Sequence, residues 1–213
     1  MLSAECKDFR SGIARLSLKF SYSLLAPFYD LAIARASAAV RAQNLKHLPA
    51  EGALDVLING IGTGLDLPFL PPSHRYIGLD LTGAMLSRAQ ARADGLRVSL
   101  VQGDSQALPF AAHSFDHAVL HLILAVVPEP TACLQETART LKPGGSVLIL
   151  DKFLRPGQNA WLRRALSPLA GQIATRLDVV FEEVLAQVPE LRLVADEPVL
   201  AHGWFRAIRL VKH

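Results

Sequence analysis

The sequence is poor in cysteine. Its only two cysteines, Cys6 and Cys133, have no neighbouring cysteine or histidine at the spacing of metal ligands. Two cysteines in a chain of 213 residues are expected to be free thiols in a reducing compartment. We therefore expect no metal site, and the small number of cysteines favours a cytoplasmic protein.

Long apolar runs are also missing. Hydrophobic residues make up 51% of the chain and the mean hydropathy is +0.28, yet no run approaches the roughly 18 apolar residues of a membrane span. The N-terminus lacks the charged region, apolar region and cleavage site of a secretory signal, so none is expected. The length fits a single domain, residues 1–213, with a sizeable buried core.

Net charge is small, but it is distributed unevenly. The formal charge is +3, whereas residues 1–50 carry seven Lys/Arg against three Asp/Glu, and residues 152–176 carry five Lys/Arg and no acid. Such charge marks either solvated helix faces or attraction to an anionic surface. Residues 7–25 have apolar side chains at helical spacing, and a basic amphipathic helix of this kind packs on its domain or lies on a membrane. Peripheral membrane contact through 7–25 and 152–176 is one of these two open interpretations.

The sequence does contain a cluster of glycines that directly follows an apolar run. Gly60, Gly62 and Gly64 follow the run that begins at Leu54, a pattern that predicts a buried strand and a tight turn. Glycine tolerates the dihedrals of such a turn, and we expect the three N–H groups to be uncovered, so that a ligand can lie against the main chain. Asp80 ends the next predicted strand. A glycine turn and a carboxylate on neighbouring strands describe a nucleoside-binding cleft.

The alternation of elements defines the fold class. Predicted strands and helices follow one another along the chain, which is typical of a doubly wound, mostly parallel α/β sheet with helices on both faces. The last two predicted strands form an antiparallel terminal hairpin, for seven strands in all. The predicted strands are 54–59, 76–80, 97–101, 116–122, 145–151, 191–200 and 204–211. The predicted helices are 31–46, 64–70, 82–94, 130–141 and 178–187.

The glycine pattern distinguishes between two families with this architecture. A dinucleotide-binding turn, G-x-G-x-x-G/A, needs a small residue where this chain has Leu65, which argues against a nicotinamide oxidoreductase. Instead, V-L-I-N-G-I-G-T-G at residues 56–64 resembles the first motif of the class I S-adenosylmethionine-dependent methyltransferases, commonly V-L-D-L-G-C-G-T-G. Further stretches resemble that family in the same order, at residues 76–86, 101–110, 114–130 and 134–149.

This resemblance implies a Rossmann-like fold and methyl transfer from S-adenosyl-L-methionine to a small-molecule or lipid-like acceptor, leaving S-adenosyl-L-homocysteine. Asp80 would accept from the ribose hydroxyls and Asp104 from the adenine amino group, while the Ser105 N–H would donate to a ring nitrogen. Leu81 and Met85 would flank the base. Capping or turn roles remain open for the two aspartates, and core packing for the two apolar residues. The cofactor-binding residues implied are Asn59, Gly60, Ile61, Gly62, Thr63, Gly64, Asp66, Asp80, Leu81, Met85, Asp104 and Ser105.

One departure from the family pattern concerns the methionine half of the cofactor. The acidic residue of the family's first motif, which helps to hold the methionine amino group, is Ile58 in this chain. Either Asp66, just past the glycines, or backbone carbonyls would take over that task. The missing acid also keeps a second hypothesis open, a non-catalytic S-adenosylmethionine- or nucleoside-binding module on the same fold.

The reaction itself makes few demands on the protein. In-line displacement at a sulfonium methyl requires alignment and exclusion of water, but neither a metal nor a covalent intermediate. His121, at the end of the fourth predicted strand, is the candidate catalytic residue, as a proton acceptor or an orienting group; a hydrogen-bonded pocket-wall histidine is the alternative. Tyr22 and Tyr29 lie in a segment, residues 1–50, that forms a helical lid in many relatives. A helical insertion near the substrate is expected at 152–190.

The acceptor is defined only in outline. The N/D-P-P-Y/F signature of nucleic-acid amino-methylases is absent after the fourth predicted strand, where this chain has His-Leu-Ile-Leu, so nucleic acid is not an expected partner. The chain is most similar to the soluble bacterial phosphatidylethanolamine N-methyltransferases and the related quinone C-methyltransferases. That resemblance depends on residues 29–31, 62–68 and 197–200.

Overall fold

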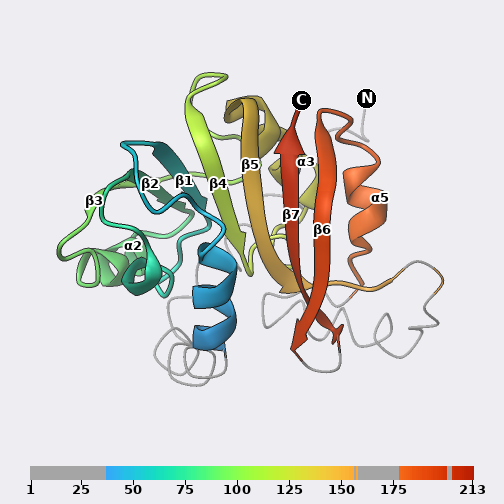
Figure 1. Cartoon of the computed structure of the whole chain (residues 1–213), viewed down its shortest axis with the longest axis horizontal. Helices are drawn as coiled ribbons and strands as arrows, with labels where there is room; N and C mark the ends of the chain where they lie inside the picture. Colours follow the sequence, from blue (N-terminus) through green and yellow to red (C-terminus); the bar gives the residue numbers. More distant parts are fainter. Residues whose placement is uncertain (1–36, 156, 158–177, 201–202) are drawn as a thin grey trace, which may run out of the picture.

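A computed structural model describes residues 37–155, 157, 178–200 and 203–213 of the chain. Seven strands form one sheet, with helices on its two faces (Figure 1). The strands are β1 Asp55–Asn59, β2 Arg75–Asp80, β3 Arg97–Gln102, β4 Phe115–His121, β5 Leu141–Lys152, β6 Leu191–Leu200 and β7 Phe205–Lys212. The helices are η1 Leu67–Phe69, α2 Gly83–Gln90, α3 Pro130–Thr140 and α5 Phe181–Leu185, and residues 37–45 are also helical.

The strand order is β3-β2-β1-β4-β5-β7-β6. Strands β1 to β5 are parallel, while β7 pairs antiparallel with both β5 and β6. The order reverses between β1 and β4, and in open α/β sheets ligands bind at the carboxyl ends of the strands at such a reversal. The predicted fold class, a doubly wound sheet with an antiparallel terminal hairpin, is confirmed.

Alternate side chains of the central strands enter two separate core layers, because successive residues of a strand point to opposite faces. In β1, Val56 and Ile58 pack in the layer that also contains Leu45, Leu48, Leu86 and Ala89. Leu57 packs in the other layer, with Leu134, Ala138, Phe181 and Val184. The helix at 37–45 and α2 therefore cover one face, and α3 and α5 cover the opposite face (Figure 1).

Three predicted helices are shorter than expected, among them the one predicted at 178–187, which forms only as α5, Phe181–Leu185. The predicted helix at 64–70 is wrong, since only the three-residue 3-10 helix η1 forms between Gly64, whose φ is +81°, and the proline pair at 71–72. Proline removes a hydrogen-bond donor and glycine at positive φ leaves the helical region, so a full α-helix has no room. Helix α2 ends at Gln90 rather than at 94, and turns lead from there into β3.

Strand β5 begins earlier than predicted. We expected the Lys-Pro-Gly-Gly stretch to lie between α3 and a strand starting at 145, but Leu141 already pairs with Phe115 of β4. An irregularity in register between Phe115 and His117 absorbs the extra residues before Ser146 resumes regular pairing. Such a bulge cannot be recognised from the apolar pattern, because it depends on the partner strand.

Several expectations fall wholly or largely outside the described residues. They concern the amphipathic helix at 7–25, the lid residues Tyr22 and Tyr29, most of the 1–50 segment and most of the insertion at 152–190. These remain predictions. In the part of the chain that is described, none of the helices combines the length and the apolar content that crossing a bilayer requires.

Candidate functional site

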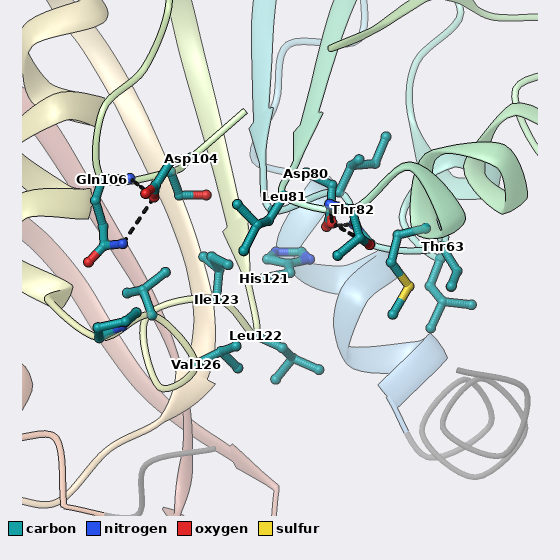
Figure 2. A pocket seen from close by; sticks show the side chains of 18 of the residues that line it. Thr63, Asp80, Leu81, Thr82, Asp104, Gln106, His121, Leu122, Ile123 and Val126 are labelled. Atoms are coloured by element: carbon teal, nitrogen blue, oxygen red, sulfur yellow. Dashed lines mark hydrogen bonds between the residues drawn. The ribbon is translucent and has the colours of Figure 1, made fainter. Parts of the chain in front are cut away.

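A cavity of about 980 Å³, including its open mouth, lies at the carboxyl ends of β1, β2 and β4. Figure 2 shows side chains from the two halves of the sheet meeting around it. The predicted catalytic residue His121 lines it. So do nine of the twelve predicted cofactor residues, namely Gly60, Ile61, Gly62, Thr63, Asp80, Leu81, Met85, Asp104 and Ser105.

The glycine turn is not a row of uncovered N–H groups, and that expectation is wrong. The Gly60 N–H donates to the Leu79 carbonyl at 2.9 Å, and the Gly64 N–H donates to the Ile61 carbonyl at 3.0 Å. The Gly62 N–H donates to Oδ2 of Asp80 at 2.9 Å. All three donors are therefore used within the protein and are not available to a ligand.

The three glycines are required for different steric reasons. A Cβ on Gly60 would lie 2.7 Å from the Ile123 side chain, and a Cβ on Gly64 would lie 3.0 Å from the Ala89 Cα. At Gly62, by contrast, a Cβ would meet nothing within 4 Å. All three have positive φ, which glycine adopts readily. Gly60 and Gly64 thus permit close packing, while Gly62 keeps open the part of the cavity beside it.

Asp80 lies at the end of β2 and lines the cavity. Its Oδ1 accepts from the Thr82 N–H at 3.0 Å and from the Thr82 hydroxyl at 3.3 Å, and its Oδ2 accepts from Gly62. Thr82 precedes α2 as predicted, but its hydroxyl bonds Asp80 rather than capping the helix. Burial raises the pKa of the Asp80 carboxyl, against the effect of these hydrogen bonds. The carboxylate therefore fixes the position of the turn and faces the cavity at the end of β2.

Asp104 faces the cavity from the neighbouring strand end. Its Oδ1 accepts from the Gln106 N–H at 2.9 Å and from Nε2 of the same residue at 3.0 Å (Figure 2). Leu81 and Met85 line the cavity with the two aspartates. Two carboxylates at adjacent strand ends with apolar side chains beside them fit a ribose and a flat base, and the open space at Gly62 is where the rest of such a ligand can pass.

Asp66 is buried and engaged by two partners on its Oδ1. Nη1 of Arg41 donates to it at 2.8 Å, and Nδ1 of His121 lies at 2.7 Å. Burial would raise the pKa of Asp66, but Arg41 and His121 outweigh burial and hold it well below its ordinary value. Asp66 is thus a carboxylate that ties the glycine turn to β4 and to the helix at 37–45. It does not line the cavity, whereas Arg41 does.

The hydrogen bonds of His121 define its tautomer. A carboxylate can only accept, so the Nδ1 that faces Asp66 carries a proton. Nδ2 of Asn44 lies 3.1 Å from the Ile149 carbonyl, which also can only accept, and this orients the Asn44 amide. The same Nδ2 lies 3.0 Å from Nε2 of His121, so Nε2 accepts. Both ring nitrogens of His121 are therefore engaged by protein groups, and this geometry favours the pocket-wall role over that of a proton acceptor.

Asn59 and Gly64 also lie outside the cavity lining. The Asn59 side chain is fully buried and its Nδ2 donates to Oγ1 of Thr137 at 3.1 Å, with Sγ of Cys133 at 3.6 Å. It therefore faces α3, and only its main chain is near the turn. Cys133 is a buried free thiol, as expected, and burial raises its pKa.

One part of the cavity is an apolar wall that the sequence did not reveal as such. It is formed by residues 122–128, Leu-Ile-Leu-Ala-Val-Val-Pro, none of which has a hydrogen-bonding side chain. Leu122 has a φ of +60°, uncommon for a residue with a side chain, and its N–H donates to the Leu150 carbonyl at 2.7 Å. This turn directs the chain across the cavity. The wall residues that line it are Leu122, Ile123, Val126, Val127 and Pro128.

Four other lining residues were not predicted as site residues: Arg41, Leu65, Thr82 and Gln106. Two signals could have found some of them. Gln106 lies two residues after Asp104, a common turn spacing, and Thr82 lies two residues after Asp80. For Arg41 no signal exists in the sequence, because its helix is placed against the cavity only by tertiary packing.

The fold, with a cavity at the carboxyl ends of its central strands, is typical of nucleotide-binding α/β proteins, and an apolar wall lines this cavity together with the two carboxylates. Residues 54–149 match the methyltransferase domain family. The phosphatidylethanolamine N-methyltransferase of Cereibacter sphaeroides is 32% identical over 186 residues, covering 85% of this chain and 91% of that protein. The ubiquinone/menaquinone biosynthesis C-methyltransferase UbiE of Syntrophotalea carbinolica is 32% identical over 160 residues, covering 70% of this chain and 65% of that protein.

A solved structure shows the same fold. The S-adenosylmethionine-dependent methyltransferase from Thermotoga maritima, described as a possible histamine N-methyltransferase, superposes with a TM-score of 0.68 at 20% identity, covering 91% of this chain and 99% of that one. This chain belongs to the class I S-adenosylmethionine-dependent methyltransferases. It is therefore an enzyme of that family, which decides against the non-catalytic binding module.

Proposed function

We propose that this methyltransferase uses S-adenosyl-L-methionine to methylate a lipid-like acceptor that lies against the apolar wall, residues 122–128. The observation that carries the proposal is the division of one cavity into two parts. Asp80 and Asp104 supply carboxylates at the ends of β2 and β3, whereas the wall formed by residues 122–128 has no hydrogen-bonding side chain. A polar, highly charged acceptor would be desolvated there without compensation.

The residues present fit the proposed cofactor. Asp80 would accept from the ribose hydroxyls and Asp104 from the adenine amino group, with Leu81 and Met85 against the base, as in the predicted assignment. The bound cofactor supplies a methyl group that is already activated as part of a sulfonium.

Arg41 is the proposed partner of the methionine carboxylate. It is a buried cation that lines the cavity on the side of the glycine turn, and its Nε and Nη1 are oriented by Ser37 and Asp66. A guanidinium held in this way is suited to a carboxylate. The methionine amino group would then meet the carbonyls of the glycine turn, because Asp66 already accepts from Arg41 and His121.

The protein's part in the reaction is alignment and exclusion of water. Ile123 packs against the backbone of Gly60, so the acceptor wall and the glycine turn meet without a gap. This contact supports a position for the acceptor on the wall, next to the proposed methionine half of the cofactor. Holding two reactants in register can supply a large part of the rate enhancement.

The relatives support the lipid-like acceptor. One of them is named for phosphatidylethanolamine and another for ubiquinone and menaquinone. These compounds share a long apolar part and differ at the atom that accepts the methyl group. The proposal includes peripheral contact with the membrane through the basic segments 7–25 and 152–176, which would be the route by which such an acceptor reaches the cavity. It also includes a cytoplasmic location.

Calorimetry and a transfer assay test the proposal together. We expect S-adenosyl-L-homocysteine to bind the full chain, and Asp80→Asn to weaken it at least about tenfold. Asp55→Asn, at the opposite end of β1, is the matched control and should bind normally. Labelled methyl groups should then move to phosphatidylethanolamine in vesicles or to a demethylated quinone, and not to short water-soluble amines. Absence of S-adenosyl-L-homocysteine binding would overturn the cofactor assignment, and transfer only to soluble amines would overturn the acceptor class.

A further inference from the structure

We infer that Gln106 is a positioning residue that makes the site selective for adenine, by fixing the Asp104 carboxylate from the acceptor side of the cavity. The inference depends on the proposed function, because Asp104 is taken to read the adenine amino group. Gln106 would orient the Asp104 carboxylate, a role separate from the direct contacts that Asp80, Asp104, Leu81 and Met85 are proposed to make with the nucleoside.

The first observation is that Gln106 binds one oxygen of Asp104 twice. Its main-chain N–H donates to Oδ1 at 2.9 Å, which is an ordinary two-residue aspartate turn. Its side-chain Nε2 donates to the same oxygen at 3.0 Å, which such a turn does not require. Two donors on Oδ1 restrict rotation of the carboxylate about its last bond. The second donor is the part of this arrangement that needs a glutamine.

The second observation is that the Gln106 amide is itself held. Its Oε1 accepts from the Glu129 N–H at 2.9 Å. An amide that accepts with its oxygen from a main-chain donor must point its nitrogen the other way, which here is toward Asp104. The orientation of Nε2 is thus set by Glu129, the residue that immediately precedes α3.

The third observation is where these groups lie. Gln106 and Asp104 both line the cavity, and residues 126–128 of the acceptor wall lead directly to Glu129. In Figure 2 Gln106 and Asp104 lie together on one side of the cavity, with Val126 below them and Asp80 across from them. The Gln106 amide therefore bridges the wall that faces the acceptor and the carboxylate that faces the base.

These contacts have a consequence for ligand choice. An adenine presents an N–H₂ donor at its six position, whereas hypoxanthine presents a carbonyl oxygen there. A carboxylate that cannot turn away repels that carbonyl, which penalises the wrong base more than it rewards the right one. A carboxylate that can rotate loses most of this discrimination while keeping much of its attraction for adenine.

The test compares two ligands that differ only at this atom. Calorimetry gives Kd for S-adenosyl-L-homocysteine and S-inosyl-L-homocysteine with the wild-type chain, Gln106→Met and Gln106→Glu. The wild type should prefer the adenosyl ligand by roughly a hundredfold or more, and both variants should lower that preference to below about tenfold. Gln106→Glu keeps an oxygen for the Glu129 N–H, loses the donor to Asp104 and adds a negative charge beside it, so it disrupts the Asp104 half of the bridge while keeping the Glu129 half. Gln187→Met, at an exposed glutamine beyond α5, is the control and should keep the wild-type preference.

The outcomes can be told apart. If both ligands weaken by the same factor in the variants and the preference persists, Gln106 has only a structural role and the inference is overturned. If Gln106→Met loses the preference but Gln106→Glu keeps it, contact with Glu129 rather than donation to Asp104 is what matters, and the inference is again overturned. If the wild-type chain binds neither ligand, the proposed function itself fails. Thermal denaturation of each variant confirms that the ratios are measured on folded protein.

Discussion

Nδ1 of His121 lies 2.7 Å from Oδ1 of Asp66, and Arg41 donates to that same oxygen at 2.8 Å. The three side chains come from β4, the glycine turn and the helix at 37–45, and all three are buried. Asn44 contacts the second ring nitrogen of His121. The imidazole that sequence alone marks as a candidate base is therefore a fixed part of the cavity wall.

The first prediction concerns His121→Asn. Because both ring nitrogens are engaged, we expect kcat to fall by less than about tenfold, whereas removal of a general base costs roughly a hundredfold or more. Stability should fall by about 1–3 kcal/mol, since Asp66 and Asn44 each lose a buried partner. Steady-state kinetics on the acceptor found by the transfer assay, together with urea denaturation, measure the two effects. A hundredfold loss of kcat with unchanged cofactor Kd would instead make His121 catalytic.

The second prediction concerns Arg41→Met. If Arg41 pairs with the methionine carboxylate, the variant should bind S-adenosyl-L-homocysteine at least about tenfold more weakly, as loss of a buried charged contact implies. 5′-Methylthioadenosine lacks that carboxylate, so its Kd should change by less than about twofold. Arg75→Met, an exposed arginine paired with Asp55, serves as the control. Equal weakening of both ligands would show that Arg41 acts on the whole cavity rather than on the carboxylate.

The third prediction is a pH dependence of cofactor binding that originates at Asp80. Burial raises the pKa of this carboxyl above its ordinary 3.8, so the proton returns at a higher pH than for an exposed aspartate. In the proposed complex the Asp80 carboxylate would accept from the ribose hydroxyls, and its protonated form would accept less well. Affinity for S-adenosyl-L-homocysteine should therefore be full at neutral pH and should fall with decreasing pH before exposed aspartates are protonated. Asp80→Asn should bind weakly and nearly independently of pH over this range.

The fourth prediction separates two glycines of the same turn. Gly64→Ala should lower the free energy of unfolding by about 2–4 kcal/mol, because alanine at positive φ costs roughly 1–2 kcal/mol and its Cβ would press on the Ala89 backbone. Gly62→Ala has only the strain of positive φ, since its Cβ meets nothing within 4 Å. Its methyl group should instead weaken S-adenosyl-L-homocysteine binding. Urea denaturation and calorimetry on both variants check the pair, and identical behaviour in both assays would contradict the steric difference.

Much of the fold could be predicted from the chain because the relevant signals are local. An apolar run ended by glycines located β1, a second apolar run ending at Asp80 located β2, and the alternation of strands and helices defined the doubly wound class. Asp104 was singled out by the family resemblance of residues 101–110. Helix ends and the start of β5 were predicted less well, since they depend on a proline-limited turn and on the register with β4.

The sequence by itself determined the parts of the site that lie on neighbouring strand ends: the glycine turn, the two carboxylates and the apolar residues beside them. Only the tertiary structure decided that the glycine N–H groups are used within the protein, that Arg41 enters the cavity, and that His121 is held by Asp66 and Asn44. The physical reason is the distance along the chain between the partners. Asn44 and His121 are 77 residues apart in sequence, and no local pattern records a contact that exists only once β1 and β4 pair.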